Sequence, residues 1–217
     1  MRYVVVLMLI LLPRLAAAEV TINRTEAVIE RRMFDPSNPP PDMPKLESTE
    51  AAVTESYFSV NTNIGGQVID QQKTDNGCRT SIKVDTVQVT LRLRVTVWLP
   101  NGAVPKIVNH EEGHRAIAEY YYRDAESVAR HFAEEFIGQT ISGSGKDCDS
   151  AGEIATKQAA QLLGAKYLGQ VDVPCAKAQE IYDQITEHGT NAVKEEKAIK
   201  QAILKARRDD TDQSPGN

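Results

Sequence analysis

The clearest pattern in the chain is a strict alternation of apolar and polar positions. From Val87 to Leu99 every second residue is Val or Leu, and the residues between them are mostly polar. Successive side chains of a β-strand point to opposite faces, so this run predicts a half-buried strand in an antiparallel sheet. Ile82 and Val84 are out of phase with the run, which predicts a bulge or bend near Asp85-Thr86.

The chain before this strand is less regular. Tyr57 to Thr62 alternates and predicts a second strand, and Asp75-Asn76-Gly77 is a strong turn signal. Val20 to Arg32 alternates weakly and fits one strand or a short helix, and a proline-rich segment follows from Asp35 to Pro44. We therefore interpret residues 19–50 as an N-terminal arm. A mobile leader is favoured over a pro-segment that covers the functional site.

A helical pattern begins after the strand. Apolar or His residues recur in steps of three and four between residues 110 and 136, which predicts one amphipathic helix from about Lys106 to Ile137. A Gly-Ser segment, Ile141 to Lys146, predicts a flexible break. It lacks the spacing of a phosphate-binding loop. The remaining sequence predicts three helices, at Ala151–Leu168, Cys175–His188 and Ala192–Arg208, and residues 209–217 predict a disordered tail.

The N-terminus has the pattern of a secretory signal peptide. A basic start is followed by a short apolar run from Val4 to Leu12 and by Ala16-Ala17-Ala18 before Glu19. The run is too short to span a bilayer comfortably. We therefore expect residues 1–18 to be removed and the protein to be exported, to the periplasm or the medium, with no stable membrane insertion afterwards.

Length and charge limit the classes of partner. The formal charge is −5, and loss of Arg2 and Arg14 with the signal peptide gives −5 − 2 = −7. An acidic chain of this kind has no general attraction to nucleic acid. The mature length fits one domain, and the oligomeric state stays open.

The candidate chemistry lies at the start of the predicted helix, in the His-Glu-x-x-His motif of His110, Glu111 and His114. Two His residues four positions apart lie on one helix face and can bind the same metal ion. The Glu after the first His is placed to accept a proton from a zinc-bound water. The two His residues also lie on the inward extension of the apolar stripe.

A catalytic zinc site needs a third protein ligand. His131 lies about 25 Å from His114 along the same predicted helix, and Glu134 and Glu135 share this distance problem. His188, before the helix-stopping Gly189, is the preferred third ligand, and Glu153 is the runner-up. Tyr182 is a candidate to stabilise the oxyanion, and Asp183 is a candidate acceptor for the ring N–H of a ligating His.

His-Glu-x-Gly-His on a long helix, followed much later by Tyr-Asp-x-x-Thr-x-His-Gly, resembles a bacterial family of secreted Zn-dependent proteases formerly described as a domain of unknown function. The resemblance covers about Glu55 to Asn191. It implies that His110 and His114 are ligands, that Glu111 is the base and that His188 is the third ligand.

Three cysteines remain, and export favours a disulfide. Cys148 and Cys175 bracket the second predicted helix and are the first candidate pair; a bridge that includes Cys78 is the second choice.

Together these patterns predict an α+β fold, in which a small antiparallel sheet is followed by a helical bundle that carries a zincin-like HExxH helix. Residues 51–208 form the zinc metalloprotease-like domain. The predicted function is a secreted Zn²⁺-dependent peptidase acting on protein or peptide substrates, with the polar face of the Thr86–Leu99 strand as a candidate substrate groove. The alternative is a non-catalytic exported binding module with a structural metal site or none. A weaker possibility is hydrolysis of another amide, such as a cell-wall peptide.

Overall fold

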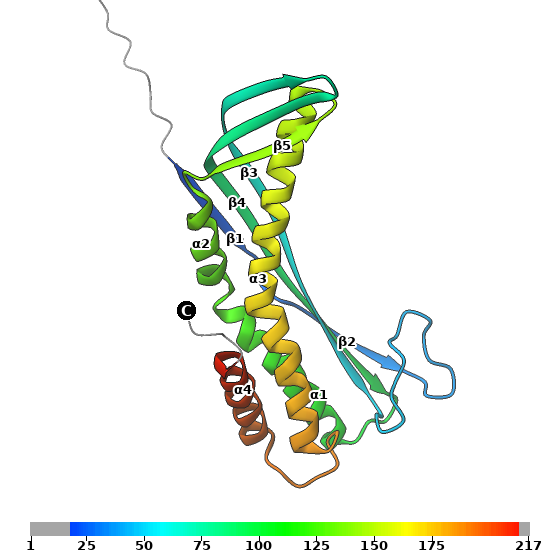
Figure 1. The fold of residues 1–217 in the computed structure, drawn as a ribbon. Helices are drawn as coiled ribbons and strands as arrows, with labels where there is room; N and C mark the ends of the chain where they lie inside the picture. Colours follow the sequence, from blue (N-terminus) through cyan, green and yellow to red (C-terminus); the bar gives the residue numbers. More distant parts are fainter. Residues whose placement is uncertain (1–17, 213–217) are drawn as a thin grey trace, which may run out of the picture.

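The computed structural model describes residues 18–212, and for residues 209–212 it describes the backbone alone. The signal peptide predicted for residues 1–18 therefore lies almost entirely outside the described residues. Within these described residues the chain forms five strands and four helices, which Figure 1 shows in their arrangement: β1 (Glu19–Arg24), β2 (Val28–Phe34), β3 (Val53–Thr74), β4 (Gly77–Pro100), α1 (Pro105–Arg123), α2 (Ala125–Phe136), β5 (Thr140–Gly145), α3 (Cys148–Thr186) and α4 (Glu195–Asp212).

A long antiparallel hairpin, β3 and β4, is the centre of the fold. Its turn lies at the predicted Asp75-Asn76 position. The alternating apolar residues of β4 from Val87 to Leu99 are all buried, as predicted. Asp85 has no partner in β3, because Gly65 pairs with Thr86 and Gly66 with Val84. This predicted bulge shifts the side-chain phase by one residue, so that Ile82 and Val84 are buried as well.

The prediction of a small antiparallel sheet is wrong. The sheet is five-stranded and mixed, because β1 and β2 pair with β4 in parallel, whereas β3 and β5 pair with it antiparallel. Three short strands occupy one edge of β4 in series: β5 along Cys78–Lys83, β1 along Thr86–Leu91 and β2 along Arg94–Pro100. The sequence predicted that residues 19–34 belong to a mobile arm. Most of them instead form β1 and β2 and are part of the sheet. Pairing between segments more than 60 residues apart leaves little trace in local sequence.

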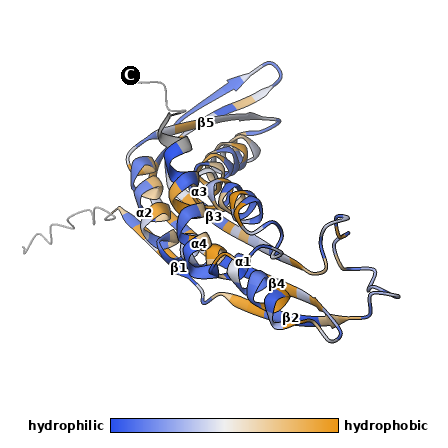
Figure 2. Ribbon diagram, turned by 90° about the horizontal axis from the view of Figure 1, so that it is seen from below, coloured by the Kyte–Doolittle hydropathy of each residue, from blue (hydrophilic) through white to orange (hydrophobic). Residues whose placement is uncertain are grey.

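The predicted helical bundle is also wrong, since the helices form a layer on one face of the sheet (Figures 1 and 2). Helices α1, α2 and α3 pack against the apolar face of β4, and α4 packs on α3 and α1. The opposite face of β4 exposes Gln88, Arg92 and Arg94. The apolar face of the sheet therefore fixes where the helices lie.

Three local predictions differ from the structure. The predicted helix Lys106–Ile137 is two helices, α1 and α2, separated at Asp124. The predicted flexible break Ile141–Lys146 is largely β5, and Gly143 is required there because a Cβ atom would lie 2.3 Å from the Ala151 carbonyl oxygen. The predicted disordered tail begins as helix, since α4 continues to Asp212.

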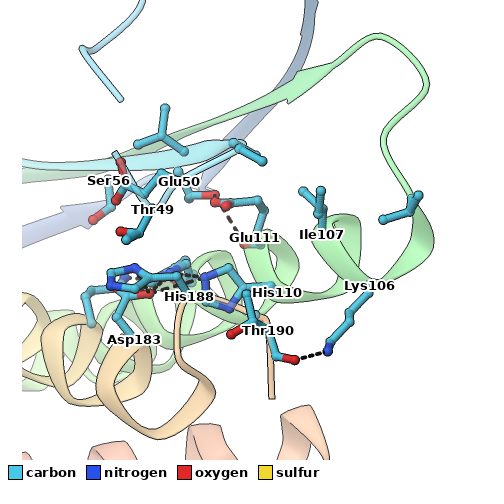
Figure 3. Close-up of a pocket in the computed structure, with 18 residues that line it drawn as sticks. Thr49, Glu50, Ser56, Lys106, Ile107, His110, Glu111, Asp183, His188 and Thr190 are labelled. Atoms are coloured by element: carbon cyan, nitrogen blue, oxygen red, sulfur yellow. Dashed lines mark hydrogen bonds and ion pairs between the residues drawn. The ribbon is translucent and has the colours of Figure 1, made fainter. Parts of the chain in front are cut away.

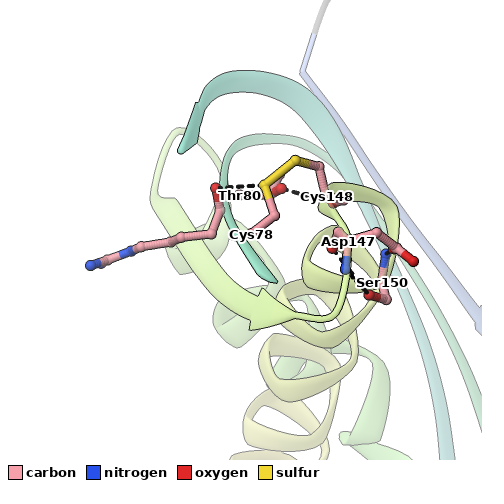
Figure 4. The surroundings of a disulfide bond; sticks show 6 residues. Cys78, Thr80, Asp147, Cys148 and Ser150 are labelled. Carbon is pink, nitrogen blue, oxygen red and sulfur yellow. Dashed lines mark hydrogen bonds between the residues drawn. A yellow bond between two sulfur atoms is a disulfide. The ribbon is translucent and has the colours of Figure 1, made fainter. Parts of the chain in front are cut away.

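The two helices predicted at 151–168 and 175–188 are one 39-residue helix, α3, with Pro174 inside it. Cys148 and Cys175 are therefore about 40 Å apart along its axis at 1.5 Å per residue, and the predicted bond between them is wrong. Cys148 is bonded instead to Cys78 (Figure 4), and Cys175 is a buried free thiol. The disulfide joins the start of β4 to the start of α3, where Thr80 also donates to the Cys148 carbonyl at 2.8 Å.

No helix in residues 18–212 is long and apolar enough to cross a membrane.

We expect removal of the disulfide by Cys78→Ala to lower the free energy of unfolding by about 2–4 kcal/mol, because the bond closes a loop of 70 residues in the unfolded chain. Denaturant unfolding under non-reducing conditions measures this change. Cys175→Ala is the matched control, in which peptide mapping should still find the Cys78–Cys148 bond. A bond from Cys148 to Cys175 in the wild type would contradict the fold.

Candidate metal centre

Helix α1 places the His-Glu-x-x-His residues on its buried side. Ile117 and Tyr121 continue the same stripe into the core, and His110, Glu111 and His114 are each less than 10% exposed. The inward orientation predicted from the apolar stripe is therefore confirmed. Pro105 opens the helix at a position where its missing N–H costs no hydrogen bond.

The last turns of α3 bring Asp183 against the two histidines (Figure 3). The Oδ1 atom of Asp183 lies 3.0 Å from His114 Nε2 and 3.2 Å from His110 Nε2, and the two Nε2 atoms are 3.2 Å apart. Three electron-pair donors at such distances repel one another unless a cation lies among them. A proton bridges two such atoms at a time, whereas a metal ion satisfies all three.

The donor set fits a metal ion in both geometry and chemistry. In a tetrahedral zinc site with bonds of 2.0–2.1 Å, the ligand atoms are about 3.3 Å apart, close to the spacing found here. Two imidazole nitrogens and one carboxylate oxygen suit Zn²⁺, and they also suit other first-row metals such as Fe²⁺. His110, His114 and Asp183 thus form a group able to hold a metal ion, and the donors alone do not fix which metal.

Gln179 orients His114. Its side-chain oxygen lies 2.6 Å from His114 Nδ1, and its side-chain nitrogen donates to the His114 carbonyl at 3.0 Å. This pairing assigns the ring proton to Nδ1 and leaves the Nε2 lone pair facing Asp183 and His110. The supporting role predicted for Asp183 is thus filled in the structure by Gln179, one turn earlier on α3, whereas Asp183 lies among the three possible ligand atoms.

Packing rather than a hydrogen bond orients His110. Its ring stacks on Tyr182, with centroids 5.1 Å apart and planes 10° from parallel. Its Nδ1 atom is buried without a hydrogen-bond partner. Gly189, at φ 76°, also lies against His110, where an added Cβ atom would approach within 2.9–3.0 Å of the Cγ and Cβ atoms.

Tyr182 is buried behind the histidines, and this position does not suit the predicted oxyanion role. Its single hydroxyl hydrogen faces two acceptors, the His110 carbonyl at 3.2 Å and the carboxylate of Glu195 on α4. Burial and the bond to Glu195 raise the pKa of this hydroxyl. Gly113 leaves room for it, because a Cβ atom there would lie 2.0 Å from the Tyr182 oxygen. The Gly in the His-Glu-x-Gly-His motif is therefore needed for α1 and α3 to approach.

Glu111 faces the cavity beside the donor group (Figure 3). Thr54 of β3 donates to its carboxylate at 2.7 Å and also contacts its carbonyl oxygen at 3.2 Å. Burial raises the pKa of the Glu111 carboxyl, against the lowering effects of His114 and Thr54. The first strand residues of the hairpin therefore fix the orientation of a carboxylate on α1.

His188 lies at the rim of the site. It follows α3 in a turn where Glu187, His188 and Gly189 all have positive φ, a conformation that costs energy for the two non-glycine residues. Its Nδ1 is 3.7 Å from Asp183 Oδ1, and its side chain is 33% exposed. The structure thus brings it near the metal group, and its role as a ligand stays a prediction. Asp183 is the third donor in contact with both histidines.

The other residues considered as ligands lie elsewhere. Glu153 is about 45 Å from Asp183 along α3 at 1.5 Å per residue, so it cannot be the third ligand. His131 is exposed on α2 and pairs with Glu135 at 3.4 Å. The donors are thus drawn from α1 and from the C-terminal end of α3.

A cavity of about 450 Å³ opens over this group. The segment before β3 and the start of β3 form one wall, and α1 and the end of α3 form the other. Besides the donor residues, the lining includes Thr49, Glu50, Thr54, Ser56, Glu111, Gln179 and His188. The three donors and Glu111 therefore line the same cavity.

Comparisons with protein-family models, with curated proteins and with solved structures gave no significant match. The function must therefore be argued from the site itself.

We expect the purified protein to bind one divalent metal ion per chain, and Asp183→Ala to lose it, because that variant removes one of three converging donors. His188→Ala should retain the metal if the ligands are those in contact. Metal analysis of the dialysed proteins measures both. Metal lost from His188→Ala and kept in Asp183→Ala would overturn this ligand assignment.

We also expect Gln179→Leu to weaken metal affinity by about 10–100-fold, because His114 would lose the acceptor that fixes its ring. Competition with a chromogenic chelator measures the affinity. Gln184→Leu, an exposed position on the same helix, is the matched control and should bind metal like the wild type.

Proposed function

We propose that this protein is a metal-dependent hydrolase that cleaves peptide bonds, with zinc as its metal. The observation that carries the proposal is the position of Glu111, a buried carboxylate that faces the same cavity as the three donors and is held there by Thr54. A purely structural metal site has no need for such a group, whereas hydrolysis needs a base next to the ion.

Each residue of the site has a distinct part in the proposed reaction. His110, His114 and Asp183 would hold the ion, which when bound supplies Lewis acidity and lowers the pKa of water to about 7. Glu111 accepts a proton from the attacking water and later returns it to the leaving amine. Thr54 and Gln179 fix the base and one ligand, respectively, before the substrate arrives.

His188 is the group best placed to contact the reacting carbonyl. It lines the cavity, and its partly exposed ring lies next to Asp183, with Nδ1 3.7 Å from Asp183 Oδ1. A ring N–H there can donate a hydrogen bond to an oxyanion, a role that suits it better than the buried Tyr182.

Two observations from the sequence support the same proposal. The motifs resemble those of bacterial secreted Zn-dependent proteases, and the N-terminal pattern is that of an exported protein. The Cys78–Cys148 disulfide is compatible with an oxidising compartment. We therefore propose that the protein acts outside the cytoplasm. The competing function is a non-catalytic exported module that uses the same metal for stability.

We expect Glu111→Gln to reduce turnover of an unfolded protein substrate by about 10²–10⁴-fold, because the general base is removed while size and hydrogen-bonding capacity are kept. Metal content and thermal stability should stay near the wild-type values. The measurement is the initial rate of cleavage by the zinc-loaded protein, with addition of a chelator as a second control.

Glu112→Gln is the matched control. Glu112 is the next residue on α1, but it pairs with Arg31 of β2 and with Arg115 and does not line the cavity, so this variant should remain active. A zinc-loaded wild type that shows no cleavage above Glu111→Gln would favour the non-catalytic module.

A further inference from the structure

Strand β3 has one unpaired edge. All of its pairings in residues 18–212 are with β4, and no described strand lies along its other side. In Figure 1, β3 forms the border of the sheet on the side away from β1 and α2. The predicted substrate strand, Thr86–Leu99 of β4, is paired on both edges, and its Trp98 is buried beneath Arg32. That prediction is wrong, and β3 is the strand with a free edge.

Two cavities follow this free edge in series. The first is the cavity over the metal group, which includes Val53, Thr54 and Ser56 of β3. The second, about 630 Å³, lies further along the same strand, between residues 60–64 of β3 and residues 156–168 of α3. Strand β3 lines both cavities, the first together with α1 and the C-terminal end of α3, and the second together with residues 156–168 of α3. We call the course of β3 past these two cavities, on the side of α3, the groove.

The lining of the second cavity shows that it exposes the strand backbone. Its wall includes five consecutive residues of β3, from Val60 to Ile64. Consecutive side chains point to opposite faces of a sheet, so contact with all five residues is the pattern expected of a cavity that lies along the edge. Because β4 covers the other edge, the free N–H and C=O groups of β3 face this groove.

The edge is unprotected over the same stretch. Natural sheets usually protect free edges with Lys, Pro or bulges. Residues 53–64 contain no Lys, Arg or Pro, and the register shifts of β3 begin only at Gly65-Gly66. The side chains around the second cavity are mainly neutral, and Thr62 Oγ1 is buried there without a hydrogen-bond partner.

An extended polypeptide backbone has the chemistry that fits such a groove. It offers donors and acceptors at the spacing of a neighbouring strand, and a neutral wall accepts varied side chains. From Thr54 to Ile64 the edge is about 33 Å long at 3.3 Å per residue, enough for about ten substrate residues on one side of the cleaved bond.

We propose that the groove between β3 and α3 binds an extended, unfolded polypeptide segment by strand addition to β3, and that it delivers this segment to the metal site. This inference rests on the proposed hydrolase function for the fate of the segment. The substrates are therefore unfolded protein chains rather than short peptides or compact folded proteins.

The test uses the Glu111→Gln protein, which binds without cleavage, and reduced, carboxymethylated α-lactalbumin as a permanently unfolded probe. Ala165→Trp, added to Glu111→Gln, fills the second cavity from an exposed position on α3. Leu162→Trp is the matched control, because Leu162 is equally accessible on α3 and does not line the cavity. Thermal unfolding checks that both variants are folded.

We expect Ala165→Trp to weaken probe binding by about tenfold or more, as judged by fluorescence anisotropy, because several edge hydrogen bonds are lost, and Leu162→Trp to leave it unchanged. Hydrogen exchange should show protection of residues 60–64 when the probe is bound. Equal binding by both variants, or protection only outside β3, would overturn the inference. Self-association of the protein through this edge, abolished by Ala165→Trp without any probe binding, would overturn it as well.

These results are separable from those of the proposed function. Probe binding that depends on Ala165, in a protein that does not cleave, supports the groove and counts against the hydrolase. Cleavage that is equal in wild type, Ala165→Trp and Leu162→Trp supports the hydrolase and counts against the groove.

Discussion

The close approach of α1 to the C-terminal end of α3 is the contact on which the site depends. Tyr182 of α3 fills the space left by Gly113 of α1, and its hydroxyl contacts the His110 carbonyl. The Tyr182 side chain alone therefore separates the two helices at this point. Only at this distance can the Asp183 carboxylate reach the Nε2 atoms of both histidines. Three electron-pair donors are held together by packing that buries their surroundings, and a cation is what makes this arrangement favourable.

The sheet positions both helices and also the base. The apolar face of β4 is one continuous surface because the Asp85 bulge corrects the side-chain phase, and α1, α2 and α3 all pack on it. The disulfide fixes the far end of α3 to β4, some 35 residues before Asp183, so the long helix is anchored at its N-terminal end and by packing at its C-terminal end. β3 completes the site from the opposite wall, where Thr54 holds Glu111.

The same strand that orients the base also offers its free edge to the solvent. In the proposed function, this one element would combine two requirements of a peptide-bond hydrolase, a fixed base and a surface that binds the substrate in extended form. A long free edge without Lys, Arg or Pro is difficult to explain by stability alone, because such edges favour aggregation. Its continuity with the metal cavity gives it a reason within the proposed function.

Features that depend on local spacing could be predicted from the amino-acid sequence. The alternation in β4, its bulge, the hairpin turn and the inward face of His110 and His114 all follow from periods of two or 3.6 residues and are present in the structure. Contacts between distant segments could not be predicted in this way, because they depend on how the whole chain packs. These are the parallel pairing of β1 and β2, the Cys78–Cys148 bond and the choice of Asp183 as the third donor. The sequence predicted two helices with a gap before Cys175, whereas α3 is one continuous helix that includes Pro174. Its length separates Cys148 from Cys175 and brings Asp183 to the histidines, because packing at both ends sets where each residue of a rigid helix lies.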